Sequence, residues 1–89
     1  MKYVLIIAKG SEAYWGHFPD VPGCTTSGND LDSIAANAVE ALGGHLEGEP
    51  VPAPRSLVEL LADPDVATEL DGSEAFVSVE YHGQPVAAA

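Results

Sequence analysis

The sequence predicts an α+β domain in which a three- to four-stranded, mainly antiparallel sheet packs against one main helix. Short runs rich in Val, Ile, Tyr and Phe lie near both ends of the chain, and residues of these types favour strands. Between them, one long segment repeats its apolar residues every three or four positions, which is the period of a helix that buries one side. The expected order is β-β-β-α-β, and 89 residues leave room for a single domain with a modest core.

Three strands are expected before the helix. The first, Lys2–Lys9, is an apolar run without polar alternation, which indicates that both of its faces are covered. Residues 10–12 favour a hairpin turn, and Ala13–Phe18 follows as the second strand. After a turn rich in proline, Cys24–Ser27 can form a short third strand.

Alternation along the second strand divides its side chains between two faces. Trp15 and His17 fall on one face, and Tyr14 and Phe18 fall on the other. Exposed aromatic residues concentrate binding energy at interfaces, so we expect Tyr14, Trp15 and His17 to contribute to a partner or oligomer interface. Tyr81 on the last strand is expected to do the same. Alternation alone leaves open which face packs on the helix.

The main helix is expected over residues 30–47. Asn29 or Asp30 can act as its N-cap by accepting a hydrogen bond from an early backbone amide. Gly43 and Gly44 interrupt it near the end, and each glycine costs ~1 kcal/mol in a helix interior. The last turn is therefore expected to fray, or else the pair lets another backbone approach closely. The predicted apolar stripe consists of Leu31, Ile34, Ala35, Ala38, Val39, Leu42 and Leu46.

Residues 49–72 are expected to form a proline-rich connector followed by two short helices. Proline alternates through the first six positions, which favours an extended and stiff chain. Ser56 and Glu59 have the spacing of a capping box, and Asp63-Pro64 can begin a second short helix. Residues 75–81 then alternate as a half-exposed strand at a sheet edge, and residues 84–89 are expected to be a flexible tail.

The charge balance excludes several classes of function. Fourteen acidic residues face three basic ones, for a net charge of −11. Lys2, Lys9 and Arg55 are too few to neutralise a row of phosphates, whereas an acidic surface steers association toward basic partners. No apolar run approaches the ~18 residues of a membrane span. We therefore expect a cytoplasmic protein that binds neither nucleic acid nor membrane.

Catalytic or metal chemistry has weak support in this sequence. Cys24 is the single cysteine and has no histidine nearby, so a small buried hydrophobe is its expected role. The three histidines lack the close spacing of a zinc site. A metal-dependent nuclease needs several converging carboxylates, and Glu40 is predicted on the solvent side of the helix. We expect no catalytic residue, cofactor or metal. The side chains weighed for these roles are His17, His45, His82, Asp20, Glu40 and Glu80.

A series of motifs runs continuously from Tyr14 to Pro54. A strand ends in a Phe-Pro-Asp-x-Pro-Gly-Cys turn, which is followed by the step Thr26-Ser27-Gly28 and a helix with alanines on one face. The exit Gly-Glu-Pro-x-Pro-x-Pro occupies residues 48–54. Together these motifs resemble the HicB-like antitoxin family of toxin–antitoxin systems. The turn residues that carry the resemblance are Phe18, Pro19, Asp20, Pro22, Gly23 and Cys24.

The resemblance implies a partly degraded ribonuclease-H-like fold without nuclease activity. It also implies a partner, the small basic HicA toxin that cleaves messenger RNA, and assembly as dimers or tetramers. Members of the family often carry a C-terminal DNA-binding module, but residues 75–89 hold no basic residue except His82, so we expect none here. The expected function is neutralisation of a HicA-type toxin. The alternative is a self-associating structural or regulatory domain with no toxin partner.

The residues of the turn also have structural reasons for their identity. Pro19 and Pro22 fix backbone angles, and Gly23 can adopt a positive φ that other residues resist. Asp20 can cap the turn with its side chain. We therefore expect the turn to be chiefly architectural and only secondarily a contact surface.

Overall fold

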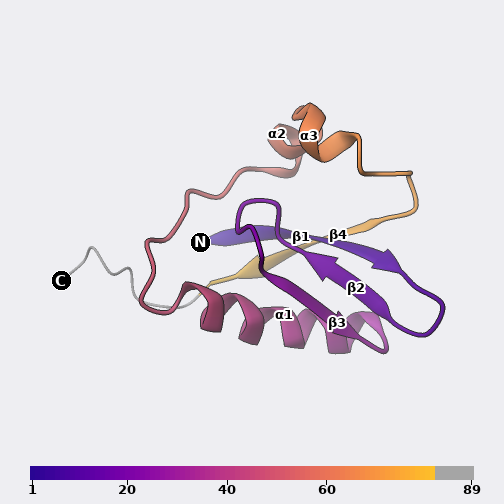
Figure 1. The fold of residues 1–89 in the computed structure, drawn as a ribbon, viewed down its shortest axis with the longest axis horizontal. Coiled ribbons are helices and arrows are strands. Elements are labelled where there is room, and N and C mark those ends of the chain that lie inside the picture. Colours follow the sequence, from indigo (N-terminus) through magenta and orange to yellow (C-terminus); the bar gives the residue numbers. More distant parts are fainter. Residues whose placement is uncertain (82–89) are drawn as a thin grey trace.

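The fold is a four-stranded antiparallel sheet with one long helix on one face and two short helices on the other (Figure 1). It comes from a computed structural model that describes residues 1–81. The strand order is β3-β2-β1-β4, so β3 and β4 form the edges. The predicted α+β class and element order are confirmed. The elements are β1 (Lys2–Lys9), β2 (Tyr14–His17), β3 (Thr25–Gly28), α1 (Leu31–Leu46), α2 (Leu57–Leu61), α3 (Pro64–Ala67) and β4 (Ala75–Glu80).

The middle of strand β1, residues 3–7, is buried on both faces, as its uninterrupted apolar sequence predicts. Tyr3, Leu5 and Ile7 belong to the main core under α1. Val4 and Ile6 point the other way and form a second, smaller cluster with residues of the short helices. Because β1 also pairs with β2 on one side and β4 on the other, it is the structural centre of the domain.

The register of β2 settles which of its faces packs on α1. Ile7 pairs with Gly16 and Ala8 pairs with Trp15, and cross-strand partners share a face of the sheet. Gly16 therefore lies on the α1 side, where an added Cβ would come within 2.9 Å of the Leu5 side chain. Trp15 lies on the opposite face, toward the short helices.

Helix α1 contacts the sheet through a single row of buried side chains spaced four residues apart: Ile34, Ala38, Leu42 and Leu46. Its N-cap is Asp30, whose carboxylate accepts a hydrogen bond from the Ser33 amide at 2.7 Å. Leu31 and Val39 belong to the predicted stripe but are 49% and 45% exposed. The predicted stripe was therefore too wide: the row spaced by four supplies the fully buried side chains of α1, and the half-buried Ala41 also packs against the core.

The glycine pair in α1 does not end the helix. The helix continues through Gly43 and Gly44 to Leu46, so the expected fraying is wrong. An added Cβ at either position would meet no atom within 4 Å among residues 1–81, so the close approach that we considered does not occur within this part of the chain either. Near the other end, Gly28 leaves no room for a side chain unless the backbone shifts, because its added Cβ would lie 2.5 Å from the Ile34 amide nitrogen.

The short helices begin where the sequence predicts. Ser56 and Glu59 form the complete capping box, with hydrogen bonds of 2.9 and 3.2 Å between each side chain and the other's amide. Asp63 caps α3, and Pro64 occupies its first turn. Strand β4 lies at the sheet edge, also as predicted. The expected tail at residues 84–89 lies outside the described residues. None of the helices in residues 1–81 combines the length and apolarity that a bilayer crossing requires.

Candidate protein-binding surfaces

The turn between β2 and β3 is held by its own backbone. The Phe18 amide donates to the Cys24 carbonyl at 3.2 Å, and the Cys24 amide donates to the Val21 carbonyl at 3.0 Å. The side chains of Phe18, Val21 and Cys24 are buried in the main core. Gly23 has a φ of +86°, a region in which side chains other than glycine are strained. The turn therefore fixes how the hairpin meets α1.

Asp20 connects this turn to a distant segment. Its two carboxylate oxygens accept hydrogen bonds from the backbone amide of Arg55 at 2.7 Å and from Nε at 2.6 Å. The Asp20 carboxylate thus binds the connector, whereas the sequence predicted that it would cap its own turn. Nη1 of Arg55 donates to Asp63 at 2.8 Å, and this bond lowers the pKa of the Asp63 carboxyl. The sequence analysis missed this role of Arg55, although a lone arginine among fourteen acids was a usable signal.

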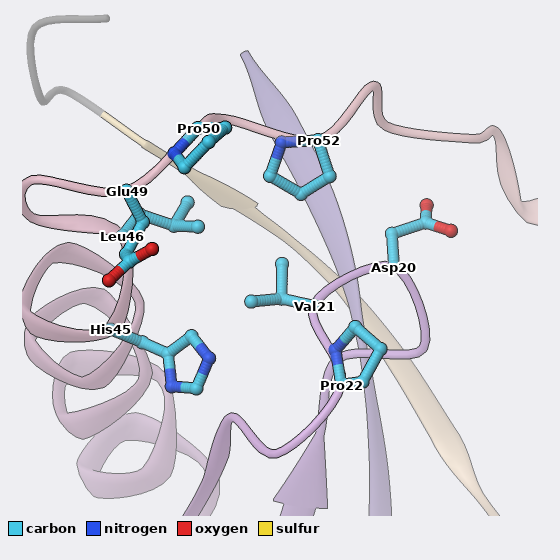
Figure 2. A pocket seen from close by; sticks show the side chains of 8 residues that line it. All are labelled: Asp20, Val21, Pro22, His45, Leu46, Glu49, Pro50 and Pro52. Atoms are coloured by element: carbon cyan, nitrogen blue, oxygen red, sulfur yellow. The ribbon is translucent and has the colours of Figure 1, made fainter. Parts of the chain in front are cut away.

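A groove of about 440 Å³ opens between the turn, the end of α1 and the connector. Val21 and Leu46 supply buried apolar side chains, and three prolines add apolar walls. Figure 2 shows the His45 ring and the Glu49 carboxylate on the α1 side of the groove. We call it the Glu49 groove, and the sequence analysis did not anticipate it. Its lining residues are Asp20, Val21, Pro22, His45, Leu46, Glu49, Pro50 and Pro52.

A second surface lies on the face of the sheet opposite α1. The short helices cover Val4 and Ile6 but leave the neighbouring part of the face exposed. There Trp15 is 59% exposed, a large fraction for a tryptophan. Two cross-strand pairs build this surface, which we call the Trp15 patch. They are Ala8 with Trp15 and His17 with Thr25, all four exposed.

The four aromatic and histidine residues predicted for an interface do not form one surface. Trp15 and His17 lie together in the Trp15 patch. Tyr14 is half-buried and packs against the main core. Tyr81 is only 9% exposed and belongs to that core, so its side chain offers little area to a partner. The four residues are divided in this way because successive side chains of a strand point to opposite faces of the sheet, and Tyr14 and Tyr81 point toward α1.

The residues weighed for chemistry lie in unrelated places as far as the structure describes them, and His82 lies outside the described residues. Asp20 is ion-paired with Arg55, and Glu40 is exposed on α1. Within residues 1–81, no group of three His, Cys, Asp or Glu side chains is arranged to hold a metal ion. Cys24 is buried, and burial raises the pKa of its thiol, which disfavours the nucleophilic thiolate.

Sequence comparison identifies the family to which this arrangement belongs. A family model described as the HicB-like antitoxin of bacterial toxin–antitoxin systems matches residues 3–83. The chain belongs to the HicB-like antitoxin family. This HicB-like antitoxin is also 42% identical over 48 residues to a 14.9 kDa protein from the rep-hol intergenic region of Haemophilus phage HP1 (strain HP1c1). That match covers 54% of the antitoxin chain and 36% of the phage protein.

Solved structures of HicB proteins share the fold of this HicB-like antitoxin. A chain of the HicA3 and HicB3 toxin–antitoxin complex matches with a TM-score of 0.72 and 32% identity, over 93% of this chain and 100% of that one. The antitoxin HicB3 matches with a TM-score of 0.70 and 33% identity, over 96% of this chain but 63% of its own length. The N-terminal domain of Burkholderia pseudomallei HicB matches with a TM-score of 0.73 and 26% identity, over 93% and 100%. The chain thus spans a little under two thirds of the HicB3 antitoxin.

Proposed function

We propose that this HicB-like antitoxin neutralises a small basic HicA-type toxin by binding it directly. The observation that carries the proposal is the similarity to a chain of the HicA3 and HicB3 toxin–antitoxin complex, which extends over 93% of this chain at 32% identity. A module of this fold thus occurs in a complex with a toxin. The proposed setting is the cytoplasm, where the messenger RNA cleaved by such a toxin is found.

The electrostatics of the chain support this partner. The net charge is −11, and one of the three basic residues, Arg55, has its guanidinium paired with Asp20 and Asp63. A toxin that cleaves RNA must attract phosphate, so it presents positive charge at its active site. Complementary charge accelerates the encounter of two proteins and disfavours partners of the wrong sign.

We assign the first contact surface to the Trp15 patch. Tryptophan is enriched among residues that dominate binding energy, and Trp15 stands exposed beside His17 on a rigid, fully paired strand. A rigid anchor loses little conformational entropy on binding. The toxin therefore meets a preformed surface.

The test is co-purification of the tagged chain with the product of an adjacent small basic open reading frame, followed by calorimetry. Trp15→Ala is expected to weaken binding by about 30-fold or more. Val39→Ala, which trims an exposed apolar residue on the helix instead, is the matched control and should leave affinity unchanged. Lack of any complex with the intact chain contradicts the proposed function. Equal losses in the two variants contradict the Trp15 patch alone.

The proposed function includes neither nucleic-acid binding nor catalysis by these 89 residues. Lys2 and Lys9 are the basic residues whose charge is not engaged by Asp20 and Asp63, and two cations cannot supply the phosphate contacts that DNA binding requires. A gel-shift experiment with promoter DNA should show no complex for this chain at about 0.15 M salt. A shifted band there would contradict this part of the proposal.

A self-associating domain without a toxin is the second candidate function. Strands β3 and β4 form the edges of the sheet as residues 1–81 build it, and sheet edges can pair with a second copy. Light scattering together with the co-purification test distinguishes the two candidates. A stable dimer or tetramer that never binds the basic partner supports self-association as the function, whereas a dimer or tetramer that binds it is compatible with the antitoxin role.

A further inference from the structure

The Glu49 groove combines an apolar interior with acidic charge. Val21 and Leu46 are buried at its floor, and Pro22, Pro50 and Pro52 form apolar walls. None of its eight lining residues is Lys or Arg. Figure 2 shows the Asp20 carboxylate turned away from the space, whereas the Glu49 carboxylate lies on the α1 side beside His45. Glu49 is thus the carboxylate available to a ligand.

This chemistry selects among classes of ligand. A phosphate or carboxylate would meet negative charge with no lysine or arginine to offset it. A metal ion lacks a three-ligand group anywhere in residues 1–81. A long cationic side chain satisfies both features at once, because its methylene stem can pack on apolar surface while its charged head reaches a carboxylate. A volume of about 440 Å³ is ample for one such side chain and part of its backbone.

We propose that the Glu49 groove receives an arginine or lysine side chain from the basic toxin. This inference rests on the proposed function, because the proposed toxin is the protein that supplies the side chain. The stem lies between the prolines and Leu46, and the charged head pairs with Glu49. The groove is then a second anchor point, on a different part of the domain from the Trp15 patch.

The walls of the groove are held in place before any partner arrives. The Tyr3 hydroxyl of β1 donates a hydrogen bond to the Pro52 carbonyl, which fixes the connector to the sheet. Arg55 holds the same connector to the turn through Asp20. Gly23 brings the turn close to the helix end, with its added Cβ position 3.5 Å from the His45 ring. A preformed groove reduces the ordering entropy that binding would otherwise cost.

The first arm of the test is an NMR titration of the isotope-labelled full chain with the peptide acetyl-Ala-Arg-Ala-amide. Saturable shifts are expected at the amides of Val21, Gly23 and His45, and not at Trp15. The same peptide with citrulline in place of arginine has no positive charge and should bind about two- to fivefold more weakly. Shifts centred on the Trp15 patch, or equal affinity for both peptides, overturn the inference.

Matched variants distinguish the groove from general acidity. Glu49→Gln removes the carboxylate in the groove, whereas Glu47→Gln removes an exposed carboxylate two residues earlier that does not line it. We expect Glu49→Gln to weaken the arginine peptide by about two- to fivefold and Glu47→Gln to have no effect. Equal losses of peptide affinity in the two variants would show that the net charge alone attracts the peptide, and they would overturn the inference.

The second arm repeats both variants with the toxin. If the toxin binds the intact chain but Glu49→Gln and Glu47→Gln bind it equally well, the groove inference fails while the proposed function stands. If the toxin does not bind the intact chain at all, the proposed function fails and the toxin cannot be the source of the side chain. The peptide titration then decides by itself whether the groove accepts a cationic side chain.

Discussion

Asp20 and Arg55 are joined by two hydrogen bonds across 35 residues of sequence. The backbone amide and Nε of Arg55 donate to the two carboxylate oxygens of Asp20 at 2.7 and 2.6 Å. The Asp20 side chain is only 7% exposed. This paired contact closes the connector onto the β2–β3 turn, and it gives the aspartate of the family motif a structural role.

The first prediction concerns this contact. Asp20→Ala removes both hydrogen bonds and is expected to lower the free energy of unfolding by about 1.5–3 kcal/mol. Arg55→Met keeps the backbone amide bond to Asp20 but removes the side-chain bonds to Asp20 and Asp63, so it measures the side-chain contribution by itself. Urea unfolding followed by tryptophan fluorescence measures both, with Glu40→Ala on the exposed side of α1 as the control. A loss for Asp20→Ala no larger than that for Glu40→Ala would show that the contact with Arg55 does not stabilise the fold.

The second prediction is a dependence of stability on pH at Asp63. A hydrogen bond from Arg55 lowers the pKa of this carboxyl below its ordinary value of 3.8 in the folded state. A lowered folded-state pKa stabilises the fold above the unfolded pKa, and this stabilisation is lost as the pH falls from about 4 through the folded value. Asp63→Asn can still cap α3 but does not titrate, so its stability should fall less steeply below pH 4.

The measurement is urea unfolding of the intact chain and of Asp63→Asn between about pH 2.5 and 7, in steps of about half a pH unit. Glu69→Gln, at an exposed position after α3, serves as the control and should follow the intact chain. Parallel curves for Asp63→Asn and the intact chain would mean that the contact with Arg55 does not contribute to stability.

The third prediction is a pair of glycine substitutions with opposite signs. Gly28→Ala places a Cβ 2.5 Å from the Ile34 amide nitrogen, and the required backbone shift should cost about 1–3 kcal/mol. Gly44→Ala puts a methyl group into open space within α1, where alanine favours the helix over glycine by roughly 0.5–1 kcal/mol. Thermal unfolding should therefore show Tm lowered in the first and raised in the second. A lowered Tm for Gly44→Ala would indicate that another copy or partner packs against this part of α1.

The fourth prediction concerns the thiol. Cys24 is buried, and burial raises its pKa, so both access and thiolate content are low. The native chain should react with Ellman's reagent at pH 8 at least about tenfold more slowly than the same chain unfolded in urea. Equal rates would mean that the β2–β3 turn opens readily in the native state.

Local signals in the sequence predicted most of the elements. The capping box at Ser56 and Glu59, the cap at Asp63 and the continuous apolar run of β1 each depend on nearby residues, and each is present in the structure. The binary pattern also placed Trp15 and His17 on one face. It could not say which face α1 covers, because that depends on the register between β1 and β2.

Features that depend on contacts between distant segments escaped the sequence analysis. The Asp20–Arg55 contact joins residues 35 apart, and the Glu49 groove needs three separate segments to meet. Tyr81 was expected at an interface because the last strand lies at an edge. Because β4 pairs with β1, its α1-facing side chains lie in the main core. Tyr81, directly after β4, lies in the same core.

The pairing of β1 with β4 has a consequence for the synthesis of the protein. Lys2 pairs with Glu80, so β1, which is synthesised before the other described strands, lacks its β4 partner until β4 has been made. Until then a nascent chain has one unpaired edge on the apolar strand β1 and an incomplete core. A chain interrupted before β4 therefore lacks one partner of β1 and part of the core, so the fold described here requires synthesis to continue through β4.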